Sequence, residues 1–388
     1  MNSPRRGTPD FQLLFLTILL VCFGIAMIFS SSSVIAATSP DYNNDPWFFT
    51  KRQILFVSFG TIGMLITMNL RPHKLKKIIL PFFLFSLFLM ILVLIIGTSV
   101  NGAKRWIFIF GFGIQPAEFA KLALIMYLSV LISKKQERIR DFKKGLLPAL
   151  IITSVIIFLN IMQLSLGTSI ILLITAGTII LAGGSNLKHL FFLGVGFASV
   201  ILLLLGIYAI FHSGEVDAVS VRSARLSVFL NPWDPNLDTS SFQIRQSLFA
   251  LGHGGLMGTG FGESIQKLHY LPFPYNDFVF SIIGEEFGFI GTTIFLLVYV
   301  WFIWRGLLIS IRSKDSFSML VGIGIMSLFA IQAIINIGGI TSLMPLTGVT
   351  LPFISYGGSS IIIMMVAMGV VLGISREQNR PVKTKTKG

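Results

Sequence analysis

The fold is decided by LGHGGLMGTGFGESIQKLHYLPFPYNDFVFSIIGEEFGFIG, residues 251–291, where a long polar stretch becomes an apolar run that ends only at Arg305. A hydrocarbon core takes about 20 helical residues, so its outer boundary should fall near Glu285. At about 1.5 Å per residue, Asp277 would then stand about 12 Å above that boundary. The stretch therefore predicts a membrane helix that carries a lone carboxylate at the height of the lipid headgroups.

The composition is typical of a polytopic membrane protein. The mean hydropathy is +0.83, and only 12% of the 388 residues are charged, a balance unlike that of soluble domains. Four long runs contain no charged residue at all: 11–40, 78–103, 145–187 and 316–375. A single cysteine, Cys22, excludes an intrachain disulfide.

These runs predict an all-α polytopic membrane protein with about ten transmembrane helices. We place the spans near 11–31, 53–69, 78–97, 117–133, 147–163, 167–184, 189–211, 277–304, 317–340 and 355–375. One large extracytoplasmic loop, 212–276, and a cytoplasmic tail, 376–388, complete a single membrane domain over 1–388. A loop of that length is far above the usual connection and is expected to be functional.

Basic residues are distributed by side of the membrane. With both termini on one side, that side holds 21 of the 30 Lys and Arg residues, the other side holds eight, and Lys121 lies inside a span. The positive-inside rule then places both termini in the cytoplasm. Because the cations gather in alternate short loops and not in one groove, we expect no nucleic-acid partner.

Two ionisable residues share one face of the fourth span. Glu118 and Lys121 stand three residues apart behind Pro116, which suits the first turn of a helix. Lipid rejects unpaired charges, so both should face protein or water. The pair is either a structural ion pair between helices or part of the lining of a water-filled cavity.

The large loop has two local features. Residues 242–251 are amphipathic and predict a helix along the membrane surface. The glycines of 254–262 resemble a nucleotide loop, but no strand precedes them and no Gly-Lys-Ser/Thr follows, so we reject that function.

Three glycines of the eighth span, Gly284, Gly288 and Gly291, are spaced for close approach of another helix. In a straight helix Glu285 and Glu286 would turn away from that face. Near the end of the chain, the uncharged segment 345–360 is broken by glycine and proline, a backbone tolerated at that depth only where it lines a cavity or is buried in protein.

Five stretches in this order carry a family resemblance: NGAKRWIFIFGFGIQPAEFAKLALI (101–125), LNPWDP (230–235), FQIRQSLFALGHGGLMGTGFGESIQKLHYLP (242–272), DFVFSIIGEEFGFIG (277–291) and TGVTLPFISYGGSS (347–360). Over nearly its whole length the chain resembles the shape, elongation, division and sporulation (SEDS) family of FtsW, RodA and SpoVE. The residues of these motifs resemble the FtsW and SpoVE branch more than RodA. One departure is Ser165, where the family carries an acidic residue.

The resemblance implies a peptidoglycan glycosyltransferase that polymerises lipid II at the outer face of the bacterial cytoplasmic membrane, for division, elongation or sporulation. It implies a class B penicillin-binding protein and other divisome or elongasome membrane proteins as partners. A divalent cation, Mg²⁺ or Mn²⁺, is left open as a cofactor. Asp277 matches the family's essential loop aspartate, and the implied substrate-binding residues are Arg105, Trp106, Gln115, Glu118, Lys121, Gln246, Gln266, Lys267, Ser355, Tyr356, Gly357 and Gly358.

The chemistry of glycan growth requires a base for the attacking sugar hydroxyl and cations for the departing diphosphate. We expect Asp277 to be the base, although an ordinary aspartate has a pKa near ~3.9 and partial desolvation would have to raise it. Lys121, Arg105 and Lys267 are the candidate diphosphate partners. Asp277 could instead be only a helix N-cap. At the level of function, a lipid II flippase or a non-catalytic scaffold or activator remains the alternative, the latter suggested by Ser165.

Overall fold

A computed structural model describes residues 7–100, 103–109, 112–135, 139–186, 188, 194, 227–234 and 238–379. Within them the long helices are α1 (Phe11–Thr38), α2 (Phe48–Asn69), α3 (Pro72–Ile96), α4 (Pro116–Lys135), α5 (Leu147–Met162), α6 (Leu166–Ala182), α9 (Asp238–His253), α10 (Val279–Ile311), α11 (Ser316–Ile340) and α12 (Gly358–Gln378). Two short helical segments precede α2 and α5, Pro40–Tyr42 and Phe142–Leu146.

The helices match the spans expected from the charge-free runs, and the all-α polytopic class is confirmed. Seven described helices are long and apolar enough to cross a membrane, and α6 is a shorter apolar helix. The count of ten is therefore approximate, and the expected span 189–211 lies outside the described residues apart from Gly194. The amphipathic stretch 242–251 is helical, as predicted, within α9.

Local sequence signals set several helix starts. Asp10 and Asp315 cap α1 and α11, because each carboxylate accepts a backbone N–H bond from the first turn. Pro72 and Pro116 stand at the first position of α3 and α4, where no backbone donor is needed.

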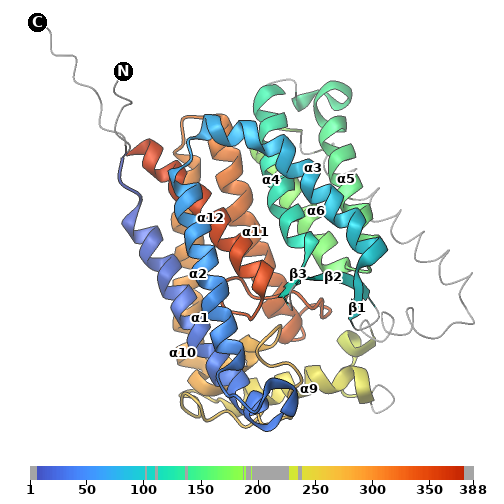
Figure 1. Cartoon of the computed structure of the whole chain (residues 1–388), viewed down its shortest axis with the longest axis vertical. Helices are drawn as coiled ribbons and strands as arrows, with labels where there is room; N and C mark the ends of the chain where they lie inside the picture. The colour runs from blue at the N-terminus through green and yellow to red at the C-terminus, as the bar shows by residue number, and fades with distance from the viewer. Residues whose placement is uncertain are drawn as a thin grey trace, which may run out of the picture.

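The bundle has two distinct ends (Figure 1). At one, here called the terminal end, α1 begins and α12 ends; at the other, the loop end, lie α9 and three short strands. Asp10 holds the terminal end together, since it pairs with Arg305 at 2.6 Å and its backbone N–H donates to the Ser375 hydroxyl at 3.0 Å. The first and last helices are thereby fixed to α10.

A small antiparallel sheet at the loop end was not expected. Strands β1 (Thr98–Val100), β2 (Ala103–Ile109) and β3 (Phe112–Ile114) lie in that order, with Thr98 opposite Trp106 and Ile107 opposite Ile114. Alternation over so few residues is too short to distinguish a strand from an apolar loop. The sheet connects α3 to the start of α4.

Helix α10 is interrupted at Gly288, whose φ of 63° and ψ of −167° are not helical. Backbone groups of the loop replace the helical hydrogen-bond partners that α10 loses at this break. The N–H groups of Thr259 and Gly260 donate to the carbonyls of Glu285 and Glu286, each at 3.0 Å. On the other side of the break, the N–H groups of Phe289 and Ile290 donate to the carbonyls of Gly255 and Leu256 at 2.9 and 3.1 Å.

This insertion corrects the expected role of one of the glycines. Gly284 packs against Leu251 of α9, so a helix does approach there as predicted, whereas Gly288 admits the loop backbone. A Cβ at Gly254 or Gly258 would collide with the α10 backbone at Gly284 or Glu286. Gly258 also has a φ of 82°, which a side chain would strain. The glycine-rich stretch therefore serves close backbone packing.

Candidate functional site

Asp277 lies at the loop end, two residues before α10, and is half-buried. The cap residue of α10 is Phe278, whose side chain makes no cap bond. Asp277 lies one position before the cap, which argues against the interpretation of Asp277 as the N-cap. An oxygen of its carboxylate would lie 3.4 Å from a Cβ built on Gly348, which has a φ of 69°. Gly348 lets the backbone of residues 345–360, here called the broken segment, approach the Asp277 carboxylate closely.

Glu118 and Lys121 form a buried ion pair in the first two turns of α4. Their side chains are 8% and 3% exposed, and the distance from Nζ to Oε1 is 2.8 Å. The Lys121 ammonium also donates to Gln332 Oε1 at 3.0 Å. The pair therefore faces protein, as expected, and it is joined to α11.

Two amides of α11, Gln332 and Asn336, complete the connection toward Asp277. Gln332 Nε2 donates to the Thr350 carbonyl at 2.9 Å and lies 3.3 Å from its hydroxyl. Asn336 Nδ2 donates to the carbonyl oxygens of Asp277 at 2.8 Å and Val349 at 2.7 Å. Residues 349 and 350 are thus bonded to two amides, of which Gln332 also contacts Lys121 and Asn336 also contacts the Asp277 carbonyl.

Aromatic packing fixes the far part of the broken segment. The ring of Tyr356 lies 5.2 Å from Phe49 and 5.9 Å from Tyr275, and its backbone N–H donates to the Tyr275 carbonyl at 2.9 Å. Burial raises the pKa of both phenols, so both stay neutral at physiological pH. Ser355 is buried and accepts from the Leu351 N–H at 2.8 Å.

Gly357 and Gly358 follow directly and lead into α12. The Gly357 N–H points to Gln53 Oε1 at 3.5 Å, and a Cβ at Gly358 would lie within 3.1 Å of the Phe56 ring. Gln115 also reaches this region, because its N–H donates to the Ser359 hydroxyl at 3.2 Å. These positions are close packed, and all lie beside the start of α4.

Arg105, on β2, holds the turn between α5 and α6. Its guanidinium donates to the carbonyls of Gln163, at 3.1 Å, and Leu164. Just beyond, Gly167 lies so close to the broken segment that a Cβ would meet Thr347. Trp106 is half-buried beside Arg105 on the same strand. Arg105 therefore adjoins the site through this turn.

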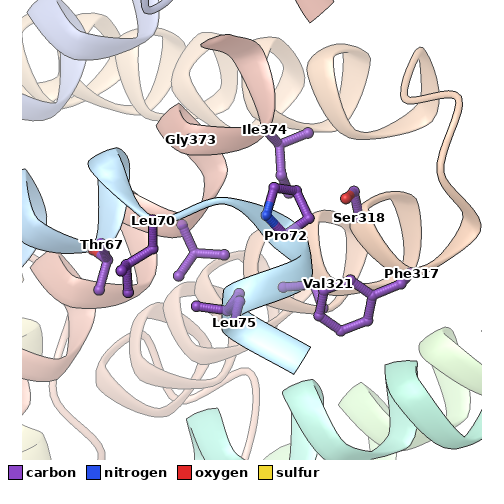
Figure 2. Close-up of a pocket in the computed structure, with 10 residues that line it drawn as sticks. Thr67, Leu70, Pro72, Leu75, Phe317, Ser318, Val321, Gly373 and Ile374 are labelled. Atoms are coloured by element: carbon purple, nitrogen blue, oxygen red, sulfur yellow. The ribbon is translucent and has the colours of Figure 1, made fainter. Parts of the chain in front are cut away.

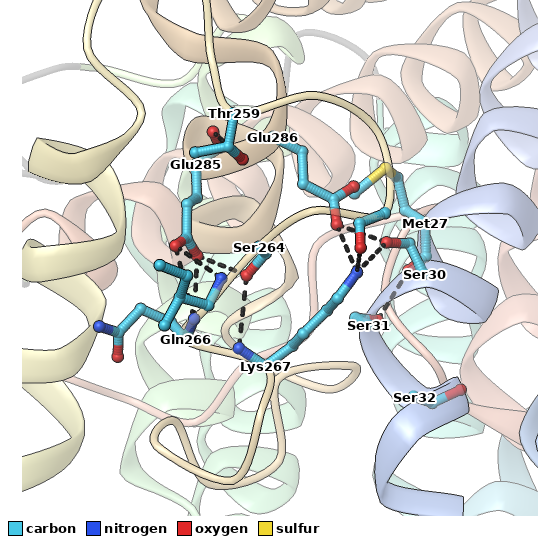
Figure 3. A network of polar contacts seen from close by, with 12 residues as sticks. Met27, Ser30, Ser31, Ser32, Thr259, Ser264, Gln266, Lys267, Glu285 and Glu286 are labelled. Carbon is cyan, nitrogen blue, oxygen red and sulfur yellow. Dashed lines mark hydrogen bonds and ion pairs between the residues drawn. The ribbon is translucent and has the colours of Figure 1, made fainter. Parts of the chain in front are cut away.

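Lys267 is placed elsewhere, in the buried network of Figure 3. Its ammonium is paired with Glu286 at 2.9 Å and donates to the Ser30 hydroxyl of α1 at 3.1 Å and to the Gly262 carbonyl at 2.6 Å. The Lys267 and Glu286 side chains are 4% and 0% exposed. Lys267 thus joins the loop, α10 and α1. Lys121 is equally buried and paired. What distinguishes Lys121 is its bond to Gln332, which is bonded in turn to Thr350 in the segment beside Asp277.

Glu285 makes a second attachment in the same network (Figure 3). Its carboxylate accepts from the Ser264 hydroxyl and from the N–H groups of Ile265, at 3.0 Å, and Gln266, at 3.3 Å. His253 Nδ1 also lies 3.0 Å from it. The prediction that both glutamates turn away from the packed face is wrong, because the loop folds over α10 and buries them.

Of the remaining predicted residues, Gln246 is half-buried on α9, and the side-chain oxygen of Gln266 is buried without a hydrogen-bond partner in the described part of the chain. A pocket between α2, α3, α11 and α12 (Figure 2) lies near the terminal end, where Pro72 and Ser318 line it. At about 10 Å³ it has room for one water molecule and no sugar.

A family model described as "Cell cycle protein", that of FtsW, RodA and SpoVE, matches residues 11–380. The chain belongs to this family. It is 41% identical to stage V sporulation protein E of Bacillus subtilis, over 96% of this chain and 99% of that protein. It is 38% identical to the probable peptidoglycan glycosyltransferase FtsW of a Geobacter species, over 94% and 96%.

Solved structures of the FtsW/RodA/SpoVE type share the fold. A chain of a peptidoglycan synthase complex aligns with a TM-score of 0.75 at 25% identity, covering 96% of this chain and 99% of that one. The rod shape determining protein RodA of Thermus thermophilus aligns with a TM-score of 0.66 at 26% identity, covering 96% and 98%. The SEDS resemblance expected from the motifs is confirmed.

The prediction from sequence missed two residues that the structure connects to the candidate site, Gln332 and Asn336. They are four residues apart in a helix that has no charged residue, so a search for charged groups does not find them. Their spacing puts both on one face, which was the available signal. As for metals, no group of three or more His, Cys, Asp or Glu gathers anywhere in the described residues, and the divalent cation stays an open expectation.

Proposed function

We propose that this protein is a peptidoglycan glycosyltransferase that polymerises lipid II at the outer face of the bacterial cytoplasmic membrane. The observation that carries the proposal is the hydrogen-bonded connection between Asp277 and the buried pair Glu118 and Lys121, which runs through Asn336, residues 349–350 and Gln332. A base and a cation on two sides of one irregular, glycine-containing segment suit a reaction that removes a proton and releases a diphosphate. The names of its relatives support the same activity.

In the proposed step, Asp277 accepts the proton of the 4-hydroxyl of one lipid-linked sugar as that oxygen bonds to the anomeric carbon of another. The bond from that carbon to the lipid diphosphate breaks, and the electron pair leaves with the diphosphate. Lys121 is the cation proposed to stabilise the growing negative charge, with Arg105 as a second candidate. Asp277 returns its proton to solvent after each addition.

The test is polymerisation of lipid II by the purified protein, alone and with a class B penicillin-binding protein, scored as glycan chains. We expect polymer in the presence of the partner. A lipid II flippase would move the lipid across vesicles and make no polymer. A non-catalytic activator, suggested by Ser165, whose hydroxyl donates to Thr168 at 2.9 Å in place of an acid, would make none with any partner.

The chain is a multi-pass membrane protein, and we propose that its termini are cytoplasmic because the terminal end carries most of the cations. Leu343, 75% exposed at the loop end, and Lys314, exposed at the terminal end, test this as cysteine variants in a Cys22→Ala background. An impermeant thiol reagent applied to intact cells should label Leu343→Cys alone. Labelling of only Lys314→Cys would invert the topology.

The ion pair of α4 should serve both folding and activity. Lys121→Met leaves a buried carboxylate without its cation and should cost about 3–5 kcal/mol of stability, most of which the double variant with Glu118→Gln should restore. Polymerisation should stay at least tenfold low in the double variant, because the cation for the diphosphate is gone. Thermal unfolding and polymer yield at equal folded protein measure the two effects; normal yield from the double variant would leave the pair a purely structural role.

A further inference from the structure

The amides of Gln332 and Asn336 are buried, 0% and 4% exposed, in a helix that has no charged residue. Burying an amide is costly unless its hydrogen bonds are made. Both side chains direct their NH₂ donors at backbone carbonyls of one strip, those of Val349 and Thr350, which neither α11 nor α12 includes. The strip also lies against Gly167 of α6, and the Thr350 hydroxyl lies 3.5 Å from that of Ser360. The two amides are the donors to its carbonyls that come from α11.

Each amide also bonds to one side of the proposed site. Gln332 accepts from the Lys121 ammonium at 3.0 Å while it donates to Thr350. Asn336 donates at once to Val349 and to the backbone carbonyl of Asp277, at 2.7 and 2.8 Å. One helical turn, about 6 Å, separates the two amides along α11.

We infer that Gln332 and Asn336 are positioning residues that hold the proposed base and the proposed diphosphate cation at a fixed separation. They do so through their hydrogen bonds to the carbonyls of Val349 and Thr350. The inference rests on the proposed function. Neither amide is required to touch substrate: Asn336 acts through Asp277, and Gln332 acts through Lys121. A rigid helix is suited to this task, since a misplacement of about 1 Å can cost on the order of 10²-fold in rate.

The test is a double-mutant cycle on polymerisation of lipid II. Asn336→Leu keeps the size and removes the donor, and we expect about a 10²-fold loss in the otherwise unchanged protein. In the Asp277→Asn background the base is already absent, so the same change should cost less than about threefold. A merely structural role would multiply the rate by the same factor in both backgrounds, and that result would overturn the inference.

Asn160→Leu is the matched control, because Asn160 is a fully buried amide whose NH₂ donates only within its own helix, to the Ile156 carbonyl at 3.0 Å. Its effect should be equal in the two backgrounds. If Asn336→Leu does not give monodisperse protein, Asn336→Ser, which leaves a smaller side chain with a donor too short for both carbonyls, replaces it. An unchanged protein that makes no polymer would instead count against the proposed function.

A parallel cycle pairs Gln332→Leu with the double variant of Lys121→Met and Glu118→Gln, which leaves no buried ion without its partner. We expect the Gln332 change to lose about tenfold or more in the otherwise unchanged protein and much less once the ion pair is absent. Equal losses in both backgrounds would restrict the positioning role to Asn336.

Discussion

Asp277→Asn is expected to reduce polymerisation of lipid II to a small residual rate while the protein still inserts and folds. The substitution keeps the size of the side chain and removes only its capacity to hold a proton. A positioned acid–base group usually contributes about 10²–10⁴-fold, so the expected loss lies in that range. Polymer yield at equal amounts of monodisperse protein, with the same class B penicillin-binding protein, measures it.

The structure makes this variant more informative than the sequence alone did. Asparagine is also a good N-cap, and an N-cap function for Asp277 would have predicted near-normal activity. Since α10 is preceded by Phe278 and not capped by Asp277, a helix-start effect cannot explain a large loss. Gly348→Ala is a companion variant on the facing side, because its Cβ would meet the Asp277 carboxylate at 3.4 Å in a strained backbone. Activity of Asp277→Asn within a few-fold of the unchanged protein would remove Asp277 from the mechanism and favour the flippase.

The membrane spans and the importance of Glu118 and Lys121 could be predicted from the sequence, because burying a charged side chain in a membrane costs so much free energy. A charge-free run of sufficient length has few alternatives to a transmembrane helix. The prediction for α11 agrees to within one residue, whereas α12 is displaced by three residues and α1 continues to Thr38, beyond its expected end at residue 31. Glu118 and Lys121 stood out for the same reason. The penalty on lone ions predicted that both would face protein or water, and the 2.8 Å contact shows an ion pair that is buried in protein.

What the sequence did not reveal is how the loop packs on α10. The helical period places Glu285 and Glu286 away from the face of Gly284, and only that face was assumed to be packed. The loop and α1 cover the other faces: Ser264, Ile265 and Gln266 donate to Glu285, and Lys267 and Ser30 contact Glu286. Gly288, at φ 63°, admits the loop backbone just beyond them. A glycine in the sequence permits a non-helical conformation but does not show that the chain adopts one. The loop backbone that bonds to α10 at Gly288 lies about 30 residues earlier in the chain, so local sequence does not reveal it.

Lys267 offers the second large effect. With its ammonium removed by Lys267→Met, the fully buried Glu286 carboxylate keeps a hydrogen bond from Ser30 but loses its cation. Leaving a buried charge without its partner lowers the free energy of unfolding by about 3–5 kcal/mol. We therefore expect a large loss of thermal stability and of folded protein. Glu286→Gln alone should also destabilise, because it strands the ammonium instead.

The double variant, Lys267→Met with Glu286→Gln, decides between structure and binding at this position. Both charges are then absent, and the loop retains its backbone bonds to α10 and its attachment through Glu285. We expect most of the stability to return and polymerisation to lie within a few-fold of the unchanged protein, the opposite of the result expected at Lys121. A double variant that folds normally but has lost tenfold or more in polymer yield would return Lys267 to the diphosphate site. The two pairs, 19 residues apart in one case and three in the other, thus separate a cation that holds the loop from one that serves the reaction.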